Sequence, residues 1–240
     1  MKGANTLPCS ARSQTIARWF GLSSLEVREG LAATGAVKVP PDLQIEAGKL
    51  ILITGPSGSG KSSLLRGLRH RQFEQRGRWI DLPRLRLAPE PVIDVMTQAI
   101  LRPTPIAPAS SDNAPAAPPS DEQAMIAALE ALSRVGLGEV WTYLRTPDEL
   151  SDGQRWRLRL AVGLARASRG PRAVLAADEF GALLDRITAR VVARTLRKAI
   201  TLDGPVAAVV ATSHEDLAEA LSPDCVVRCD FGEAAVTRVR

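Results

Sequence analysis

The stretch Leu50-Ile51-Leu52-Ile53-Thr54-Gly55-Pro56-Ser57-Gly58-Ser59-Gly60-Lys61-Ser62-Ser63-Leu64-Leu65-Arg66 decides how the rest of the chain is interpreted. Its first four residues are apolar, which predicts a buried strand, and a helical pattern begins after Ser62. The residues between them fit the Walker A spacing Gly-x4-Gly-Lys-Ser. A plain strand-to-helix turn needs neither the lysine nor the following serine, so the stretch predicts a phosphate-binding loop.

Each part of this loop has an expected contact with a bound nucleotide. Small residues let successive backbone N–H groups surround the α- and β-phosphates, and the helix N-terminus adds the positive end of its dipole. Lys61 would reach the β- and γ-phosphate oxygens, and the Ser62 hydroxyl would face Mg²⁺. The predicted nucleotide-binding residues are Gly55, Pro56, Ser57, Gly58, Ser59, Gly60, Lys61, Ser62 and Ser63.

The composition is that of an ordinary globular protein. The chain has 240 residues, of which 45% are hydrophobic, enough for a sizeable core. No run approaches the roughly 20 apolar residues of a spanning helix, and polar residues follow Met1–Leu7 where a signal peptide would have an apolar core. We therefore expect a cytoplasmic protein with no membrane insertion of its own, associated with a membrane only through a partner.

The charge and the cysteine content indicate which ligands to expect and whether the thiols are reduced. The net charge of +5 suits nucleic acid, anionic membranes or phosphate ligands, although solvated helix faces explain each arginine cluster equally well. Cys9, Cys225 and Cys229 have no disulfide-framework spacing, so we expect reduced thiols. Because only His70 and His214 could join them, a zinc site is not expected.

Strands and helices alternate in the second half of the chain. Apolar runs predict strands at 173–177, 206–211, 225–229 and 234–239, with helices at 187–200 and 215–221. This alternation predicts an α/β P-loop NTPase fold with a mainly parallel sheet flanked by helices. Upstream, the runs 36–39 and 43–45 predict an antiparallel N-terminal β portion, and 85–87 predicts a further strand. A short helix is expected at 10–20, where Trp19-Phe20 would either plug the core or sit against an adenine ring.

The segment 88–170 carries helical patterns but no strand pattern, so we expect an inserted helical subdomain within a single nucleotide-binding domain spanning 1–240. Proline, alanine and serine dominate residues 102–120, which predicts a flexible loop. Ser120 with Gln123, and Ser151 with Gln154, each match the capping-box pattern that begins a helix. Met125, Leu129 and Leu132 are expected on one face of the first of these helices.

The strand predicted at 173–177 ends in Asp178-Glu179. An acidic pair at a strand end is usually just solvated, but after a phosphate loop it predicts the second half of a nucleotide site. Asp178 would hold Mg²⁺, and Glu179 would polarise the water that attacks the γ-phosphate.

With these motifs in order, the chain resembles the ATP-binding cassette (ABC) ATPases over residues 36–227. Leu150–Arg155 is similar to the family's LSGGQ signature and its following arginine, with Asp152 in place of a glycine. Residues 182–185 resemble the D-loop, and 212–214 resemble the switch-histidine loop. Phe180 stands where transporter subunits commonly have proline.

The resemblance implies a head-to-tail dimer that holds two ATP molecules, each between Walker A of one copy and the signature of the other. Ser151, Gly153 and Gln154 would then contact ATP on the partner copy. His214 would contact the γ-phosphate, which makes Glu179, His214 and Lys61 the implied catalytic set.

Besides Phe180, three positions depart from the family pattern. A carboxylate at Asp152 would repel phosphate unless it turns away, toward Arg155. Either Gln98 or Glu90 could fill the Q-loop position. Trp19 and Phe20 lie too far upstream to be assigned as the adenine-stacking residue.

The implied activity is hydrolysis of Mg-ATP to drive a conformational change in a partner. The sequences of residues 150–157 and 178–180 resemble those of a soluble, non-transport group of ABC ATPases that is often joined to acetyltransferase-like domains. We therefore expect an acetyltransferase-like partner. Two alternatives stay open: the ATP-binding subunit of a membrane transporter, partnered by a permease, and a DNA-associated ABC ATPase. A small-molecule kinase would leave the signature and the switch histidine unexplained.

Overall fold

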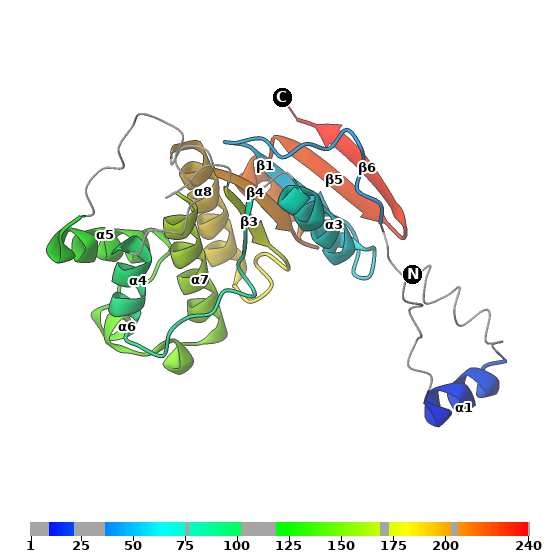
Figure 1. Ribbon diagram of the computed structural model, residues 1–240, viewed down its shortest axis with the longest axis horizontal. Helices are drawn as coiled ribbons and strands as arrows, with labels where there is room; N and C mark the ends of the chain where they lie inside the picture. Colours follow the sequence, from blue (N-terminus) through cyan, green and yellow to red (C-terminus); the bar gives the residue numbers. More distant parts are fainter. Residues whose placement is uncertain are drawn as a thin grey trace.

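The protein is described by a computed structural model over residues 10–21, 37–74, 77–101, 119–168, 173–202 and 206–239. The described strands form one sheet in the order β2-β3-β4-β1-β5-β6 (Figure 1). They are β1 (Leu50–Thr54), β2 (Arg78–Asp81), β3 (Ala173–Ala177), β4 (Val206–Ala211), β5 (Cys225–Asp230) and β6 (Glu233–Arg238). β1 to β5 pair in parallel and β6 runs antiparallel to β5, which confirms the predicted mainly parallel fold.

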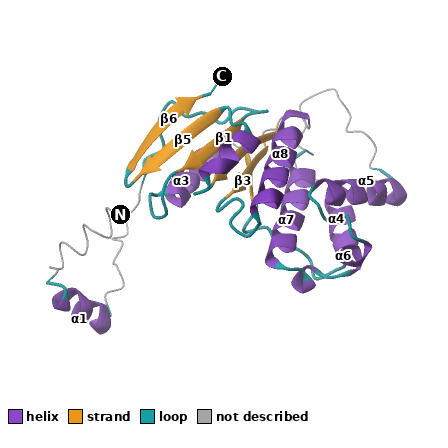
Figure 2. Ribbon diagram, turned by 180° about the vertical axis from the view of Figure 1, so that it is seen from behind, coloured by secondary structure: helices purple, strands orange, loops and turns teal. Residues whose placement is uncertain are grey.

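Helices cover both faces of this sheet, as Figures 1 and 2 show from opposite sides. One face carries α3 (Lys61–Glu74) and the other carries α7 (Asp152–Ala167), α8 (Arg186–Leu202) and α9 (Ala218–Leu221). The remaining described helices are α1 (Ala11–Trp19), α4 (Val92–Leu101), α5 (Asp121–Arg134), α6 (Val140–Leu144), and the 3-10 turns η1 (Pro147–Glu149) and η2 (Glu215–Leu217). The described part of 88–170 contains helices and turns but no strand.

Successive side chains of the central strands point to opposite faces of the sheet, so they contribute to two separate hydrophobic cores. Ile51 and Ile53 of β1 pack with Leu64 and the rest of the α3 side, whereas Leu50 and Leu52 belong to the core under α7 and α8. Every residue of β1, β3 and β4 is buried, which explains why these strands are unbroken apolar runs. Full burial of each large aliphatic side chain stabilises the fold by about 1.5–3 kcal/mol.

The prediction of strands at 36–39 and 43–45 is wrong for the residues that the structure describes, since residues 37–49 form no strand. Pro40 and Pro41 have no N–H to donate to a sheet. The carbonyl oxygens of Pro40 and Leu43 instead accept hydrogen bonds from the Arg71 guanidinium of α3, at 2.9 and 2.6 Å. The antiparallel pair in the sheet is formed by β5 and β6.

Two further expectations differ from the structure. Residues 85–87 are not a strand; the edge strand is β2, whose short sequence Arg-Trp-Ile-Asp carries too little apolar pattern to be found. On α5 the buried residues are Ala124, Ala128 and Leu132, while Met125 and Leu129 are exposed. Small residues let α5 lie close to its neighbours, so the larger side chains turn outward.

The N-terminal helix lies where it was expected, and Ser10 caps it through the N–H of Ser13. None of its described residues is buried, and Trp19 and Phe20 are each 76% exposed, so the interpretation of this pair as core is wrong. The expected flexible loop falls almost entirely outside the described residues, since its described part is Pro119 and Ser120. No described helix has the length and apolar character needed to cross a bilayer.

Candidate ATP-binding and hydrolysis site

The loop between β1 and α3 depends on its glycines. Gly55, Gly58 and Gly60 have φ angles of +142°, +79° and +96°. Residues with a Cβ atom rarely adopt such positive φ angles. At Gly55 an added methyl group would lie 2.2 Å from the carbonyl oxygen of Cys229 in β5. The loop therefore starts pressed against the neighbouring strand, where only glycine fits.

The first turn of α3 presents unpaired donors. The earliest helical bond runs from the N–H of Leu64 to the carbonyl of Gly60, at 2.9 Å. The N–H groups of Lys61, Ser62 and Ser63 have no acceptor among the described residues. Such groups, together with the helix dipole, form a site for an anion.

Lys61 is held across the same loop. Its ammonium donates to the carbonyl oxygens of Gly55 and Pro56, at 2.8 and 2.7 Å. These two bonds place a positive charge beside the unpaired amides, which is the arrangement that triphosphate binding needs.

The sheet brings Asp178, Glu179 and His214 to the same end of the strands as this loop. β1, β4 and β3 are neighbours and run in parallel, so their carboxyl ends meet. Gly55 follows β1, Asp178 follows β3, and the 212–214 loop with His214 follows β4. Acidic and imidazole groups are therefore assembled next to the phosphate loop by strand order alone.

Thr212 links these three strand ends, a role the sequence did not indicate. It is 1% exposed, and its N–H donates to the carbonyl of Ile53 at 3.0 Å. Its hydroxyl donates to the carbonyl of Phe180 at 2.9 Å and accepts from the N–H of His214 at 3.1 Å. The one sequence signal is a polar residue directly after the apolar run 206–211.

Glu179 is presented to solvent by an unusual backbone conformation. Its φ angle is +52°, and its N–H donates to the Asp178 carboxylate at 3.1 Å. Holding a residue with a side chain there costs about 1–2 kcal/mol. The next residue, Phe180, is fully buried and packs edge-to-face on Trp156 of α7, with ring centroids 5.1 Å apart. This contact connects the acidic pair with the helix that carries the signature.

The signature begins α7 with the predicted capping box. The Ser151 hydroxyl accepts from the N–H of Gln154 at 3.2 Å, and the Gln154 side chain accepts from the N–H of Ser151 at 3.0 Å. The hydroxyl proton of Ser151 remains available to a ligand. The Asp152 carboxylate is 75% exposed and lies 3.3 Å from Arg155, which confirms the expected direction.

Within one chain the signature and the phosphate loop remain separate. No described hydrogen bond or ion pair joins Ser151, Gly153 or Gln154 to residues 55–63. Gly153 instead faces the D-loop, where an added methyl would lie 3.1 Å from the carbonyl oxygen of Leu183.

The two Q-loop candidates lie together, because the side chain of Gln98 donates a hydrogen bond to that of Glu90. The pair joins the second half of α4, which carries Gln98, to the turn before that helix, which carries Glu90, so either residue could act from the same place.

The donor set at the loop suits Mg²⁺ bound together with a nucleotide. Ser62 and Asp178 offer two oxygen ligands, and the described residues contain no cluster of three or more His, Cys, Asp or Glu that could hold a metal alone. Mg²⁺ is typically held by one or two protein oxygens plus phosphates and water. Cys225 and Cys229 are free thiols whose pKa values are raised by burial; Cys9 lies outside the described residues.

Three features together define a P-loop ATPase of the cassette type. They are a glycine-rich phosphate loop after β1, an acidic pair after β3, which β4 separates from β1 in the sheet, and a capped signature helix. The ABC transporter family profile matches residues 40–180, which is more than half of the chain. The chain therefore belongs to the ABC transporter family, and it is an ATP-binding and ATP-hydrolysing member.

Known proteins are similar over most of the chain. The lipoprotein-releasing system ATP-binding protein LolD of Maricaulis maris is 32% identical over 200 residues, covering 73% of this chain and 79% of that protein. The aliphatic sulfonates import ATP-binding protein SsuB 2 of Rhodococcus jostii is 31% identical over 209 residues, covering 82% and 74%. Among solved structures, the dimeric post-hydrolysis state of the cassette MJ0796 bound to ADP and Pi has a TM-score of 0.60 at 22% identity, covering 82% of this chain and 88% of that one. Both curated relatives are named for transport, which favours the transporter alternative over the expected non-transport role.

Proposed function

We propose that this chain is the ATP-binding subunit of a membrane transporter, acting as an ATP-dependent head-to-tail dimer. The names of the similar proteins support the transport role, and they lend no support to an acetyltransferase-like or nucleic-acid partner. In this proposal residues 1–240 form one nucleotide-binding domain, with 88–170 as its helical insertion, and the chain meets the membrane through its permease.

The loop would bind and orient the triphosphate. The amides of Lys61, Ser62 and Ser63, and the ammonium that now lies on the loop carbonyls, would hold the phosphate oxygens. Ser62 and Asp178 would hold Mg²⁺, which when bound neutralises charge on the phosphates. Glu179 would orient the attacking water, and His214, positioned through Thr212, would donate to the γ-phosphate.

The signature would complete the site of a second copy. The hydroxyl proton of Ser151 and the exposed start of α7 are free for a ligand, and they make no described contact with their own phosphate loop. Because Asp152 is paired with Arg155, its carboxylate is directed away from an incoming phosphate. A second chain, arranged head to tail, would bring these donors to the γ-phosphate.

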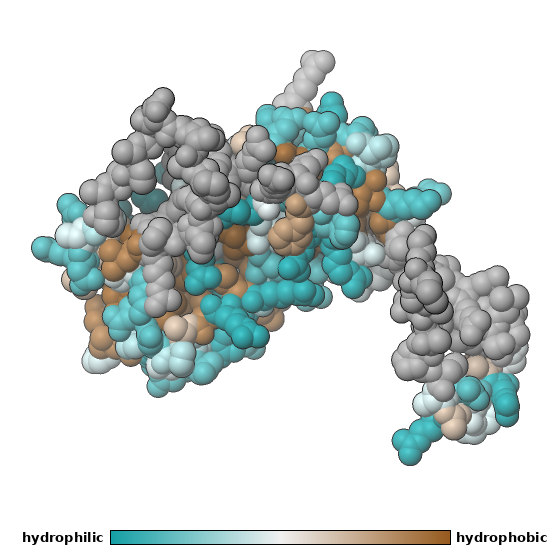
Figure 3. Space-filling view, in the orientation of Figure 1, coloured by the Kyte–Doolittle hydropathy of each residue, from teal (hydrophilic) through white to brown (hydrophobic). Residues whose placement is uncertain are grey.

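The observation that carries the transport role is a groove on the helical insertion. A cavity of about 370 Å³ lies between residues 83–89, before α4, and residues 147–159, around the start of α7. Arg159 lines it, and its Nε is buried with no acceptor among the described residues. Next to it, Val140, Trp141 and Leu144 of α6 are 64%, 73% and 62% exposed. Figure 3 shows apolar surface on this insertion, at the left of the view.

An apolar ridge beside a groove with an unpaired arginine suits a helix that has apolar and acidic side chains. Glu90 and Gln98, the Q-loop candidates, lie just beyond residues 83–89 of this groove. A permease segment seated there would therefore contact the segment that leads back to the ATP site.

Site-specific photo-crosslinking tests this proposal in membranes of the source cell. A photoreactive amino acid at Leu144 is expected to capture a membrane-spanning subunit. The matched control is Phe231, which is 72% exposed in the turn between β5 and β6 and should not capture it. Capture of a soluble acetyltransferase-like enzyme or of nucleic acid from Leu144, with no membrane protein, would overturn the transport role.

A further inference from the structure

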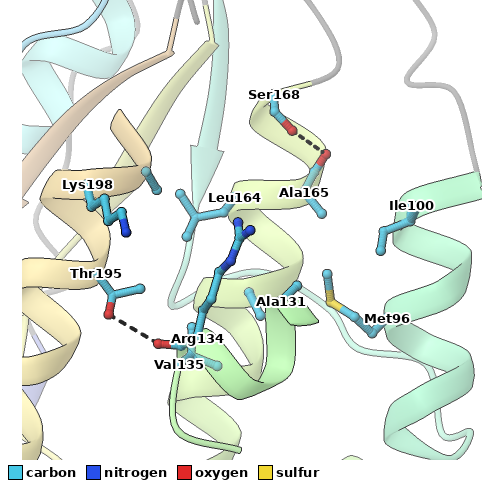
Figure 4. A pocket seen from close by; sticks show the side chains of 12 residues that line it. Met96, Ile100, Ala131, Arg134, Val135, Leu164, Ala165, Ser168, Thr195 and Lys198 are labelled. Carbon is cyan, nitrogen blue, oxygen red and sulfur yellow. Dashed lines mark hydrogen bonds between the residues drawn. The ribbon is translucent and has the colours of Figure 1, made fainter. Parts of the chain in front are cut away.

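A second cavity, of about 510 Å³, lies among α4, α5, α7 and α8 (Figure 4). None of the described residues assigned to the nucleotide site lines it. Its volume falls within the roughly 300–1,000 Å³ of small-molecule sites. It separates the helical insertion, which supplies α4 and α5, from α8 of the core.

One side and the middle of this cavity are apolar. Met96 and Ile100 of α4 line one side, and Leu164 of α7 and Ala131 of α5 line the middle (Figure 4). Met96 is fully buried from bulk solvent. Water gains few hydrogen bonds from such walls, so an apolar group is the better occupant.

On the opposite side, the described lining residues include two positively charged side chains and no acidic one. The ammonium of Lys198 has no acceptor among the described residues, and Arg134 has only an exposed ion pair with Glu130, at 3.8 Å. Pairs with such exposure contribute little, so the guanidinium is available to a ligand. The hydroxyl of Thr195 donates to the carbonyl of Arg134 at 3.1 Å, which holds α8 beside the end of α5 and keeps the two cations on one side (Figure 4).

We propose that this cavity binds an amphipathic carboxylate, with its acyl chain along Met96, Ile100 and Leu164 and its head group between Arg134 and Lys198. The apolar wall accounts for the chain, and the two cations without an acid account for the head group. An occupant bridges the insertion and the core helix. Its binding therefore stiffens the position of α7, which carries the signature, and changes the rate of ATP hydrolysis.

Calorimetric titration with decanoate tests this site on the intact chain, below the concentration at which decanoate forms micelles. Decanoate is expected to bind at one site per chain, at least ten-fold more tightly than decanol, with no binding of acetate. Lys198→Glu and Arg134→Glu, both at exposed positions, are each expected to weaken decanoate binding roughly ten-fold while decanol binding is kept. Lys38→Glu, an exposed lysine outside the cavity, is the matched control and should have no effect.

A cavity-filling variant, Ala131→Phe, is expected to abolish binding of both decanoate and decanol. Circular dichroism of each variant identifies any that fails to fold, and the two charge reversals keep the test valid if Ala131→Phe does. Equal binding of decanoate and decanol, or charge reversals that leave decanoate binding unchanged, would overturn the assignment of the head-group site. Absence of any decanoate binding to the wild-type chain would overturn the proposal as a whole.

Discussion

Replacing Thr212 with valine tests whether its buried hydroxyl fixes the positions of the loops that carry Glu179 and His214. The side chain keeps its shape, but the carbonyl of Phe180 loses its donor and the N–H of His214 loses its acceptor. Leaving a buried polar group unsatisfied costs about 1–3 kcal/mol. Phe180 is fully buried and His214 only half-buried, so the free energy of unfolding should fall by about 2–3 kcal/mol.

Urea unfolding and steady-state ATPase assays measure the two consequences of Thr212→Val. We expect kcat to fall at least ten-fold, because His214 and the turn carrying Glu179 both lose a support. Binding of ATP itself should change less than about three-fold, because residues 55–63 keep all their contacts. Thr237→Val, at an exposed hydroxyl on β6, is the control and should change the free energy of unfolding by no more than about 0.5 kcal/mol. Wild-type stability and kcat in Thr212→Val would refute the reasoning.

Three further changes test separate parts of the structure. Asp152→Gly should keep or raise the ATPase rate, because the carboxylate is exposed and already turned to Arg155; a large loss would give the aspartate a positive role. At Asp224, burial acts to raise the pKa, but the Arg197 ion pair at 2.6 Å and a backbone N–H outweigh it, so the pKa lies below its usual value. Its stabilising effect is therefore present above the unfolded pKa of about 3.9 and is lost as pH falls through the folded pKa. In urea titrations, Asp224→Asn should lower the free energy of unfolding by about 1–2 kcal/mol at pH 7 and by little at pH values below the folded pKa. An equal loss of stability at both pH values would contradict the role of the ion pair. Gly55→Ala should abolish nucleotide binding in a fluorescent-ATP titration and lower stability, because its methyl group would lie 2.2 Å from a β5 carbonyl; near-normal binding would show that the loop can shift.

The parts of the fold that could be predicted from the sequence are those determined by full burial of a strand or by contacts between residues close together in the chain. β1, β3 and β4 are buried on both faces, so their sequences are continuous apolar runs that no solvent-exposed segment would carry. The capping boxes at Ser120 and Ser151 are local, since each side chain bonds within its own first turn. The phosphate loop is likewise one uninterrupted stretch.

The parts that could not be predicted depend on contacts between distant residues. Val37–Ile45 has apolar residues spaced like strands, but Arg71 takes up the carbonyl groups of Pro40 and Leu43. β2 is a strand because β3 pairs with it, not because of its own pattern. Thr212 was part of a recognised loop, yet its bonds to Phe180 and His214 become evident only when three strand ends meet.

Multi-angle light scattering of Glu179→Gln tests the composite ATP site most directly. This substitution removes the proposed water-polarising carboxylate and leaves the loop and the signature intact. At saturating Mg-ATP the variant should have twice the monomer mass, and it should return to a monomer when ATP is replaced by ADP. Adding Ser151→Arg, which blocks the exposed start of α7, should prevent the dimer. A Glu179→Gln chain that stays monomeric in saturating Mg-ATP would contradict a site shared between two copies.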